Sequence, residues 1–149
     1  MRPFLIRLIE VPAITDPATL GYLAGIIDGE GWISFVNATD PAQRRWTLGV
    51  ANTDYALMEF LTETIGGYVQ HRGLRHGRLT ARKPSYQWSL QRSSDVMSVL
   101  MDVHPYMVVK KQRALQVIDE ILGWYTWGDE DRPYDNGPFL QFARPIQSE

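Results

Sequence analysis

The sequence predicts a single α+β domain over residues 15–125, with the order α-β-β-α-β-β-α followed by one further helix. Apolar residues recur at helical spacing in the helical segments, and the runs between them alternate between polar and apolar residues, as half-buried strands do. The chain of 149 residues is long enough to bury one hydrophobic core, and it contains no internal repeat and no linker-like stretch. We therefore expect one domain.

The first half of the domain is expected to contain two helices and two strands. Asp16 is typical of an N-cap, and a helix follows it over residues 17–27, with proline at its first position. Residues 32–38 and 45–52 alternate as two strands joined by a turn. A second helix over residues 53–65 then carries its apolar residues at helical spacing and ends at a pair of glycines.

The second half repeats this order of elements without repeating the sequence. Residues 68–72 and 85–91 are expected to form a second pair of strands, joined by a long basic segment. A third helix over residues 93–103 ends where Pro105 interrupts it, and a further helix covers residues 109–124.

Two terminal segments lie outside this pattern. Residues 1–14 are an N-terminal extension that could form a strand or an ordered arm, and residues 126–149 are expected to be an irregular tail. No apolar run approaches the ~20 residues that span a bilayer, so we expect no membrane partner. The chain has no cysteine, which excludes disulfides and thiolate metal sites.

The distribution of charge favours a nucleic-acid partner more than the total charge does. The formal net charge is −2, but the segment from Thr64 to Ser94 contains no acidic residue. Its basic residues are Arg72, Arg75, Arg78, Arg82, Lys83 and Arg92. A nucleic-acid binder needs a local basic surface rather than a basic total. A solvated charged hairpin would have the same composition.

The most informative stretch is residues 20–35, in which a helix rich in small residues ends in two carboxylates and a strand follows directly. Glycine in a helix costs roughly 0.5–1 kcal/mol relative to alanine, so its repeated use indicates a close contact. The small residues expected on the contact face are Gly21, Ala24, Gly25 and Gly29. If a second copy of the helix packs there, the acids Asp28 and Glu30 of both chains would meet in the interface and could bind a divalent metal ion.

Residues Leu23 to Gly31 read LAGIIDGEG and resemble the LAGLIDADG nonapeptide of homing endonucleases at every position, with conservative replacements only. An ordinary helix with a glycine-rich cap would explain two glycines but not nine matching positions. The order of elements is also that of one subunit of this family, so the resemblance covers roughly residues 17–124. It implies a saddle-shaped antiparallel four-stranded sheet with the helices on one face and DNA on the other. Since the motif occurs once, the resemblance implies a homodimer that makes a staggered double-strand cut in a near-palindromic site.

Alternation along the strands identifies the side chains that the resemblance directs towards the major groove. The first strand alone favours neither face, and counting from Glu30 selects its row. The expected rows are Ser34, Val36 and Ala38; Gln43, Arg45 and Thr47; Tyr68, Gln70 and Arg72; and Ser85, Gln87 and Ser89. Arginine and glutamine suit bidentate contacts with guanine and adenine. The remaining basic residues are expected to contact phosphates: Arg75, Arg78, Arg82 and Lys83.

The resemblance also implies metal-dependent hydrolysis of a phosphodiester bond. Glu30 matches the family's metal-ligating acid, and the carbonyl of Gly29 is a further ligand by the same resemblance. Mg²⁺ is the natural ion because it binds few carboxylates together with phosphate oxygens and water; Mn²⁺ would substitute, and Ca²⁺ would support binding without cleavage. Asn52 matches a residue that orients water. Lys110, or Lys111 if the register shifts by one, matches a lysine that stabilises the transition state.

Other functions on the same fold stay open, namely an RNA-splicing maturase or a non-catalytic DNA-binding protein. The presence of Glu30, Asn52 and Lys110 together favours catalysis, and the three histidines lack the spacing of an HNH or zinc site. Lysine occurs only at positions 83, 110 and 111, so arginine supplies nearly all of the 15 basic residues. This usage is typical of GC-rich coding and favours the cytoplasm or nucleoid of a bacterial, archaeal or phage host over an organelle. Either an intron or an intein could carry the gene.

Overall fold

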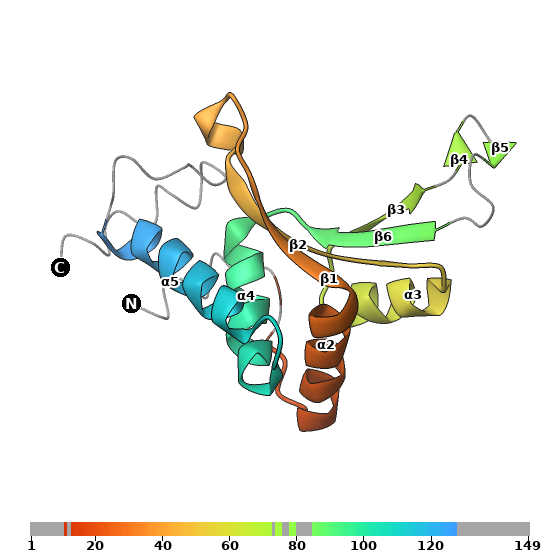
Figure 1. The fold of residues 1–149 in the computed structure, drawn as a ribbon, viewed down its shortest axis with the longest axis horizontal. Coiled ribbons are helices and arrows are strands. Elements are labelled where there is room, and N and C mark those ends of the chain that lie inside the picture. Colours follow the sequence, from red (N-terminus) through yellow and green to blue (C-terminus); the bar gives the residue numbers. More distant parts are fainter. Residues whose placement is uncertain (1–10, 12, 73, 76–77, 80–84, 128–149) are drawn as a thin grey trace.

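The computed structural model describes residues 11, 13–72, 74–75, 78–79 and 85–127 (Figure 1). Its elements are α2 (Pro17–Glu30), β1 (Gly31–Val36), η1 (Pro41–Gln43), β2 (Arg45–Asn52), α3 (Tyr55–Thr64), β3 (Tyr68–Arg72), β4 (Leu74–Arg75), β5 (Arg78–Leu79), β6 (Ser85–Leu90), α4 (Ser93–Val103), η2 (His104–Tyr106) and α5 (Lys111–Trp127). The predicted order of helices and long strands is confirmed. The short β4–β5 hairpin within the basic segment is an addition that the sequence did not predict.

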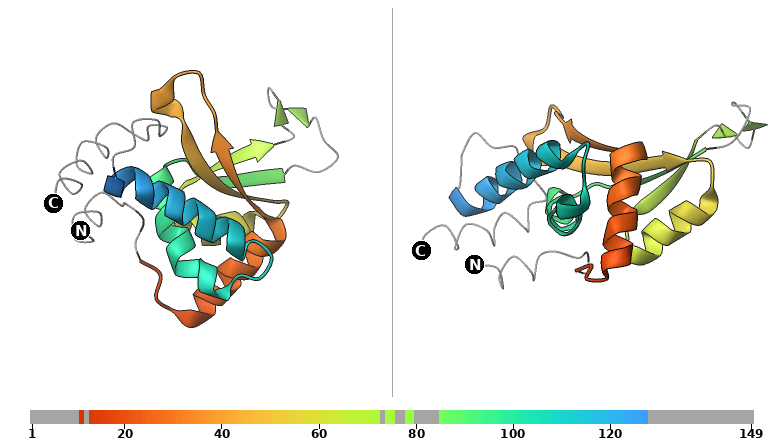
Figure 2. Two further views of the ribbon diagram at one scale, coloured as in Figure 1. Left: turned by 60° about the vertical axis from the view of Figure 1, so that its left-hand side comes forward. Right: turned by 60° about the horizontal axis from the view of Figure 1, so that its bottom comes forward.

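The four long strands form one antiparallel sheet in the order β1-β2-β6-β3. The two predicted pairs therefore meet along β2 and β6, where Val50 lies opposite Trp88. Figures 1 and 2 show the helices on one side of this sheet, with the β1–β2 hairpin rising at one end and the β4–β5 hairpin at the other. The predicted fold class, α+β with an antiparallel four-stranded sheet and helices on one face, is confirmed.

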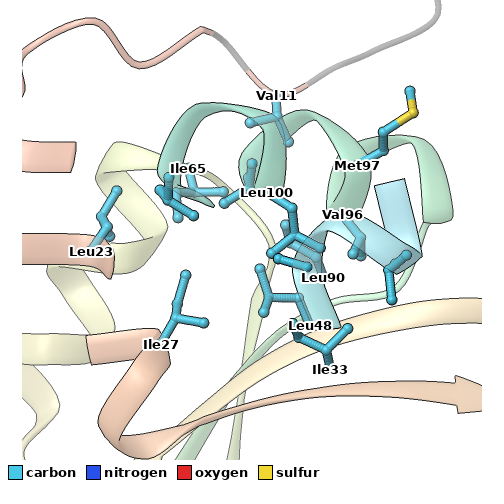
Figure 3. Close-up of a cluster of buried hydrophobic side chains, with 14 of the residues drawn as sticks. Val11, Leu23, Ile27, Ile33, Leu48, Ile65, Leu90, Val96, Met97 and Leu100 are labelled. Carbon is cyan, nitrogen blue, oxygen red and sulfur yellow. The ribbon is translucent and has the colours of Figure 1, made fainter. Parts of the chain in front are cut away.

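The core lies between the sheet and the helices. Figure 3 shows part of this core, to which Leu23 and Ile27 of α2, Leu48 of β2, Leu90 of β6 and Leu100 of α4 all belong. Each of these side chains is no more than 3% exposed. Burying one such side chain contributes roughly 1.5–3 kcal/mol, so this contact between helices and sheet supplies much of the stability that keeps α2 in place.

Helix α2 turns one apolar stripe to the core and leaves another face free. The buried residues are Leu20, Leu23, Ala24 and Ile27, which follow the i, i+3, i+4, i+7 spacing of a core-facing stripe. Ala24 is 0% exposed within a single chain, so its predicted place in a dimer interface is wrong. Gly21, Gly25 and Gly29 are exposed, and a Cβ added at any of them would meet nothing within 4 Å.

Helix α2 is capped at its start and passes into β1 without a loop. The Asp16 carboxylate accepts hydrogen bonds from the N–H and hydroxyl of Thr19 at 3.0 and 2.8 Å, and these bonds hold the pKa of Asp16 below its usual value. At the other end, a Cβ on Gly31 would lie 2.8 Å from the carbonyl oxygen of Ile27. Only glycine fits this direct passage from helix to strand, which places Glu30 at the edge of the sheet.

The chain just before α2 also packs against the domain. Val11 and Ile14 are 8% and 9% exposed, and the Ile14 N–H donates to the Asp102 carboxylate at 3.1 Å. Residues 1–10 and 12 of the predicted extension over residues 1–14, and residues 128–149 of the predicted tail over residues 126–149, lie outside the described residues. None of the helices in the described part of the chain is long and apolar enough to span a membrane.

Candidate active site and nucleic-acid interface

Glu30 and Asn52 form a hydrogen-bonded pair where α2 and β2 end. The Glu30 carboxylate accepts a hydrogen bond from the Asn52 amide nitrogen at 2.7 Å. The amide oxygen of Asn52 in turn accepts from the Asp54 N–H at 2.8 Å, which fixes the amide with its NH₂ group towards Glu30. A carboxylate offers about four acceptor positions, so this bond orients Glu30 and leaves it capacity for a cation or water.

Lys110 reaches the same helix end from the other side. Its Nζ donates to the main-chain carbonyl of Asp28 at 2.5 Å, and its backbone N–H donates to the Asp28 carboxylate at 3.0 Å. Lys111 is the first residue of α5, and within the described part of the chain it makes no hydrogen bond to Asp28. Of the two predicted alternatives, Lys110 is therefore the lysine that lies against the end of α2. A cation is favoured there because the last carbonyls of a helix carry partial negative charge.

The Asp28 carboxylate is engaged within its own chain. It accepts hydrogen bonds from the backbone N–H groups of Val108 at 2.6 Å and Val109 at 3.3 Å, in addition to that of Lys110. Asp28 is thus an acid at the end of a helix, and because its side chain stays partly exposed, its place in a dimer interface remains a prediction. Partial burial opposes its ionisation, but the bonds from Val108, Lys110 and Val109, with the charge of Lys110, outweigh burial and hold the pKa of Asp28 below its usual value.

The groups at the end of α2 suit a hard cation. The Glu30 carboxylate and the carbonyl of the exposed Gly29 are oxygen donors at the negative end of a helix. In the described part of the chain, no three His, Cys, Asp or Glu side chains come together to hold an ion. Mg²⁺ fits such a sparse oxygen set, because it binds one or two carboxylates and takes its other ligands from water and phosphate.

The face of the sheet opposite the helices carries the predicted polar rows. Residues that lie directly opposite one another share a face, and the register pairs Ser34 with Thr47, Gln70 with Gln87, and Arg72 with Ser85. The side chains on this outer face are Trp32, Ser34, Val36, Arg45, Thr47, Ala51, Tyr68, Gln70, Arg72, Ser85, Gln87 and Ser89. None of them is acidic, whereas the helices expose acids such as Glu59 and Asp119. The surface is thus suited to a polyanion.

Some predicted contact residues lie elsewhere than expected. Strand β1 ends at Val36, so Ala38 and Gln43 lie in the turn at the tip of the β1–β2 hairpin rather than in strand rows. Thr47 shares the outer face but is only 5% exposed, and its hydroxyl donates to the Ser34 carbonyl at 3.3 Å. Thr47 is therefore a poor DNA contact.

The basic segment is described only in part. Arg75 and Arg78 lie opposite each other in the backbone of the β4–β5 hairpin. Arg82 and Lys83, which were predicted to contact phosphates, lie outside the described residues. The β4–β5 hairpin nevertheless lies beyond the ends of β3 and β6, at the end of the sheet away from η1 (Figure 1).

The outer face also contains two arrangements that the sequence did not predict. The Arg45 guanidinium donates to the Gln43 carbonyl at 2.6 Å and to the Gln91 amide oxygen at 2.8 Å, and Gln91 donates to the Ser89 hydroxyl at 3.1 Å. Arg45 is therefore held in one orientation. Residue 91 continues the alternation of β6, which is the signal that could have identified it.

The second arrangement is an indole packed on bare backbone. A Cβ at Gly49 would lie 2.0 Å from the ring of Trp32, which sits directly opposite on β1. Gly49 thus leaves room for the Trp32 ring on the outer face. Trp32 lies two residues after Glu30 in the sequence. Because β1 has apolar residues on both faces, alternation alone did not reveal it.

Comparison with solved structures identifies the fold. The chain is similar to the homing endonuclease I-CvuI in complex with its DNA target, with a TM-score of 0.59, 20% identity, and 88% of this chain and 78% of that chain covered. It is also similar to the archaeal intron-encoded homing endonuclease I-Vdi141I complexed with DNA, with a TM-score of 0.52, 15% identity, and 89% and 98% covered. The LAGLIDADG homing endonuclease I-SmaMI, bound to cleaved DNA, matches with a TM-score of 0.57 and 17% identity over 92% of this chain and 46% of that chain.

These likenesses show that the chain has the LAGLIDADG homing-endonuclease fold. The nonapeptide-like sequence over residues 23–31 covers the second half of α2 and its junction with β1, and Glu30 is the eighth residue of that match. No protein-family profile matches the sequence, and no curated protein matches it either.

Proposed function

We propose that the chain is a site-specific DNA endonuclease of the LAGLIDADG type that acts as a homodimer. The observation that carries the proposal is the position of Glu30, a carboxylate held by Asn52 beside an acid-free sheet face, at the helix end that Lys110 contacts. The fold, whose solved examples include homing endonucleases bound to DNA, supports double-stranded DNA as the substrate. A staggered cut at a near-palindromic site and a role in intron homing are part of the proposal.

Phosphodiester hydrolysis needs an oriented water and compensation for the charge that develops on the phosphate. Glu30 and the Gly29 carbonyl would hold Mg²⁺, or Mn²⁺ in its place, and a bound ion would neutralise charge and make water more nucleophilic. Asn52 keeps the Glu30 carboxylate oriented. The Lys110 ammonium, already at the end of α2, would stabilise negative charge in the transition state.

The exposed glycines of α2 support the homodimer. They border a groove of about 530 Å³ that also contains the two residues of the active-site pair, Glu30 and Asn52. The groove is lined by Gly21, Tyr22, Gly25, Ile26, Gly29, Glu30, Asn52 and Leu57. A second α2 helix packed there would bring two Glu30 carboxylates towards each other across a two-fold axis. Two chains would then supply one acid for each strand of the duplex.

The outer face would read the DNA. Arg45, Gln70 and Gln87 are candidates for base contacts, and the arginines of the β4–β5 hairpin are candidates for phosphate contacts. Phosphate contacts supply affinity without sequence information. Loss of a phosphate contact should therefore weaken binding to all sequences, whereas loss of a base contact should change the sequence specificity.

The test is selection of cleavable sites from a randomised pool of DNA duplexes incubated with the chain and Mg²⁺. The proposal expects a single family of near-palindromic sites with a fixed stagger between the two cuts. Binding of duplexes in Ca²⁺ without any cleavage in Mg²⁺ or Mn²⁺ would instead indicate a non-catalytic DNA-binding protein. Absence of both binding and cleavage, with splicing of a host intron RNA, would indicate a maturase.

A further inference from the structure

The bonds between Asp28 and the segment before α5 join parts of the chain that are 80 to 82 residues apart. Three consecutive backbone N–H groups, those of Val108, Val109 and Lys110, donate to one carboxylate. They lie directly before the first residue of α5. A carboxylate that accepts hydrogen bonds from the backbone at a helix start acts as a cap, and here the capping residue comes from a different helix.

The same contact fixes the lysine that the proposed function places in the active site. The Lys110 backbone is bonded to the Asp28 carboxylate and the Lys110 ammonium to the Asp28 carbonyl, so the residue is held at two points. Met107, just before them, is anchored in the core at 3% exposure, but Val108 and Val109 are 83% and 76% exposed and have no such packing. Beyond Met107, the position of residues 108 and 109 therefore depends on hydrogen bonds to Asp28 rather than on burial of their side chains.

We infer that Asp28 is a positioning residue, whose carboxylate holds the segment 108–110 so that the Lys110 ammonium stays at the Asp28 carbonyl, in the last turn of the helix that ends at Glu30. The inference rests on the proposed function, in which Lys110 stabilises the transition state. It assigns different tasks to the two acids of the motif: Glu30 acts on the metal and the substrate, and Asp28 acts only through Lys110.

A purely structural role for Asp28 makes a different prediction. If the carboxylate only stabilised the domain, its removal would lower the unfolding midpoint and reduce DNA binding and cleavage in proportion. If it positions Lys110, its removal should slow cleavage by bound enzyme while DNA affinity stays the same. Its effect should also vanish when Lys110 has already been removed, because residues that act through one another are not additive.

The experiment measures single-turnover cleavage and binding of a duplex selected from a randomised pool by binding in Ca²⁺. The variants are Asp28→Asn, Lys110→Met and the double variant, with Asp16→Ala as the matched control because Asp16 caps the opposite end of α2. Asp28→Asn should slow cleavage roughly 10- to 100-fold, as loss of a supporting hydrogen bond at a metal site commonly does. The double variant should cleave at the rate of Lys110→Met alone, and Asp16→Ala should cleave at the unmutated rate.

A second variant tests the same contact from the other side. Val108→Pro removes the N–H that makes the shortest of the three carboxylate bonds and leaves α2 untouched. Met107, at φ −83° and ψ 154°, already has the extended backbone required before proline. This variant should also slow cleavage and add nothing to Lys110→Met. It keeps the inference testable if Asp28→Asn does not fold.

Amide hydrogen exchange gives a measurement that does not depend on activity. The amides of residues 108–110 should be protected in the unmutated chain and should lose protection in Asp28→Asn, whereas those of the middle of α5 should keep theirs. Unprotected amides at 108–110 in the unmutated chain would overturn the inference even if no cleavable DNA were found. Full cleavage by Asp28→Asn, in an experiment where Glu30→Gln is inactive, would overturn it while leaving the proposed function intact.

Discussion

Replacing Gly25 by leucine should weaken the proposed dimer while leaving each chain folded. A Cβ at this position meets nothing within 4 Å of its own chain, so the substitution causes no clash inside the protomer. Replacing a helical glycine also reduces the entropy of the unfolded chain, which stabilises the protomer by roughly 0.4–1 kcal/mol. In a two-fold interface the leucine would appear twice, and excess volume in a packed contact costs about 1–3 kcal/mol at each occurrence.

The dimer should therefore lose roughly 2–6 kcal/mol, which corresponds to at least about a 30-fold increase in its dissociation constant. Sedimentation equilibrium across a concentration series measures this constant, and urea unfolding at low concentration measures the stability of the chain. Gln116→Leu is the control, since it adds an exposed leucine to α5 rather than to the glycine face. A Gly25→Leu dimer as tight as that of the unmutated chain would show that the glycine face of α2 is not the interface.

Two further predictions concern the outer face of the sheet. Arg78→Ala should weaken binding to all duplexes about equally and lower the slope of log affinity against log salt concentration by roughly 0.9. Arg45→Ala should instead relax the base preference at particular positions. Binding measured for several duplexes at several salt concentrations separates the two effects. An unchanged salt slope for Arg78→Ala would exclude a phosphate contact at that residue. Gly49→Ala should destabilise the chain by about 1–3 kcal/mol in urea unfolding, because its Cβ must displace the Trp32 ring, and stability equal to the unmutated chain would contradict that packing.

Local patterns in the sequence were sufficient for the order of the elements and for most of the outer face. Alternation along β2, β3 and β6 separated polar from apolar rows because the inward residues of β2 and β6, such as Leu48 and Trp88, pack in the core while the opposite rows are polar. Strand β1 carries apolar residues on both faces, so its row was chosen by counting from Glu30, and the choice agrees with the register. The same pattern could have placed Ala24 in the core, since it continues the stripe formed by Leu20, Leu23 and Ile27.

Contacts between distant segments were beyond the reach of such patterns. The carboxylate of Asp28 bonds to residues 80 and more positions away, and nothing in the sequence near Asp28 specifies that pairing. The cross-strand bond from Arg45 to Gln91 is a similar case, because it depends on how β2 and β6 pair. The choice between Lys110 and Lys111 also needed the structure, since it depends on the bonds from Lys110 to Asp28, which lies 82 residues earlier.

The most direct test of the proposed active site is the cleavage rate of Glu30→Gln. The substitution keeps the size of the side chain and removes the charge that would bind the metal, so it should abolish cleavage of a selected duplex in Mg²⁺. Binding of the same duplex in Ca²⁺ should stay close to that of the unmutated chain, because the outer face supplies the affinity. Glu59→Gln, an exposed acid on α3, is the matched control and should cleave normally. Cleavage by Glu30→Gln at the unmutated rate would contradict the assignment of Glu30 as the metal-binding carboxylate of the active site.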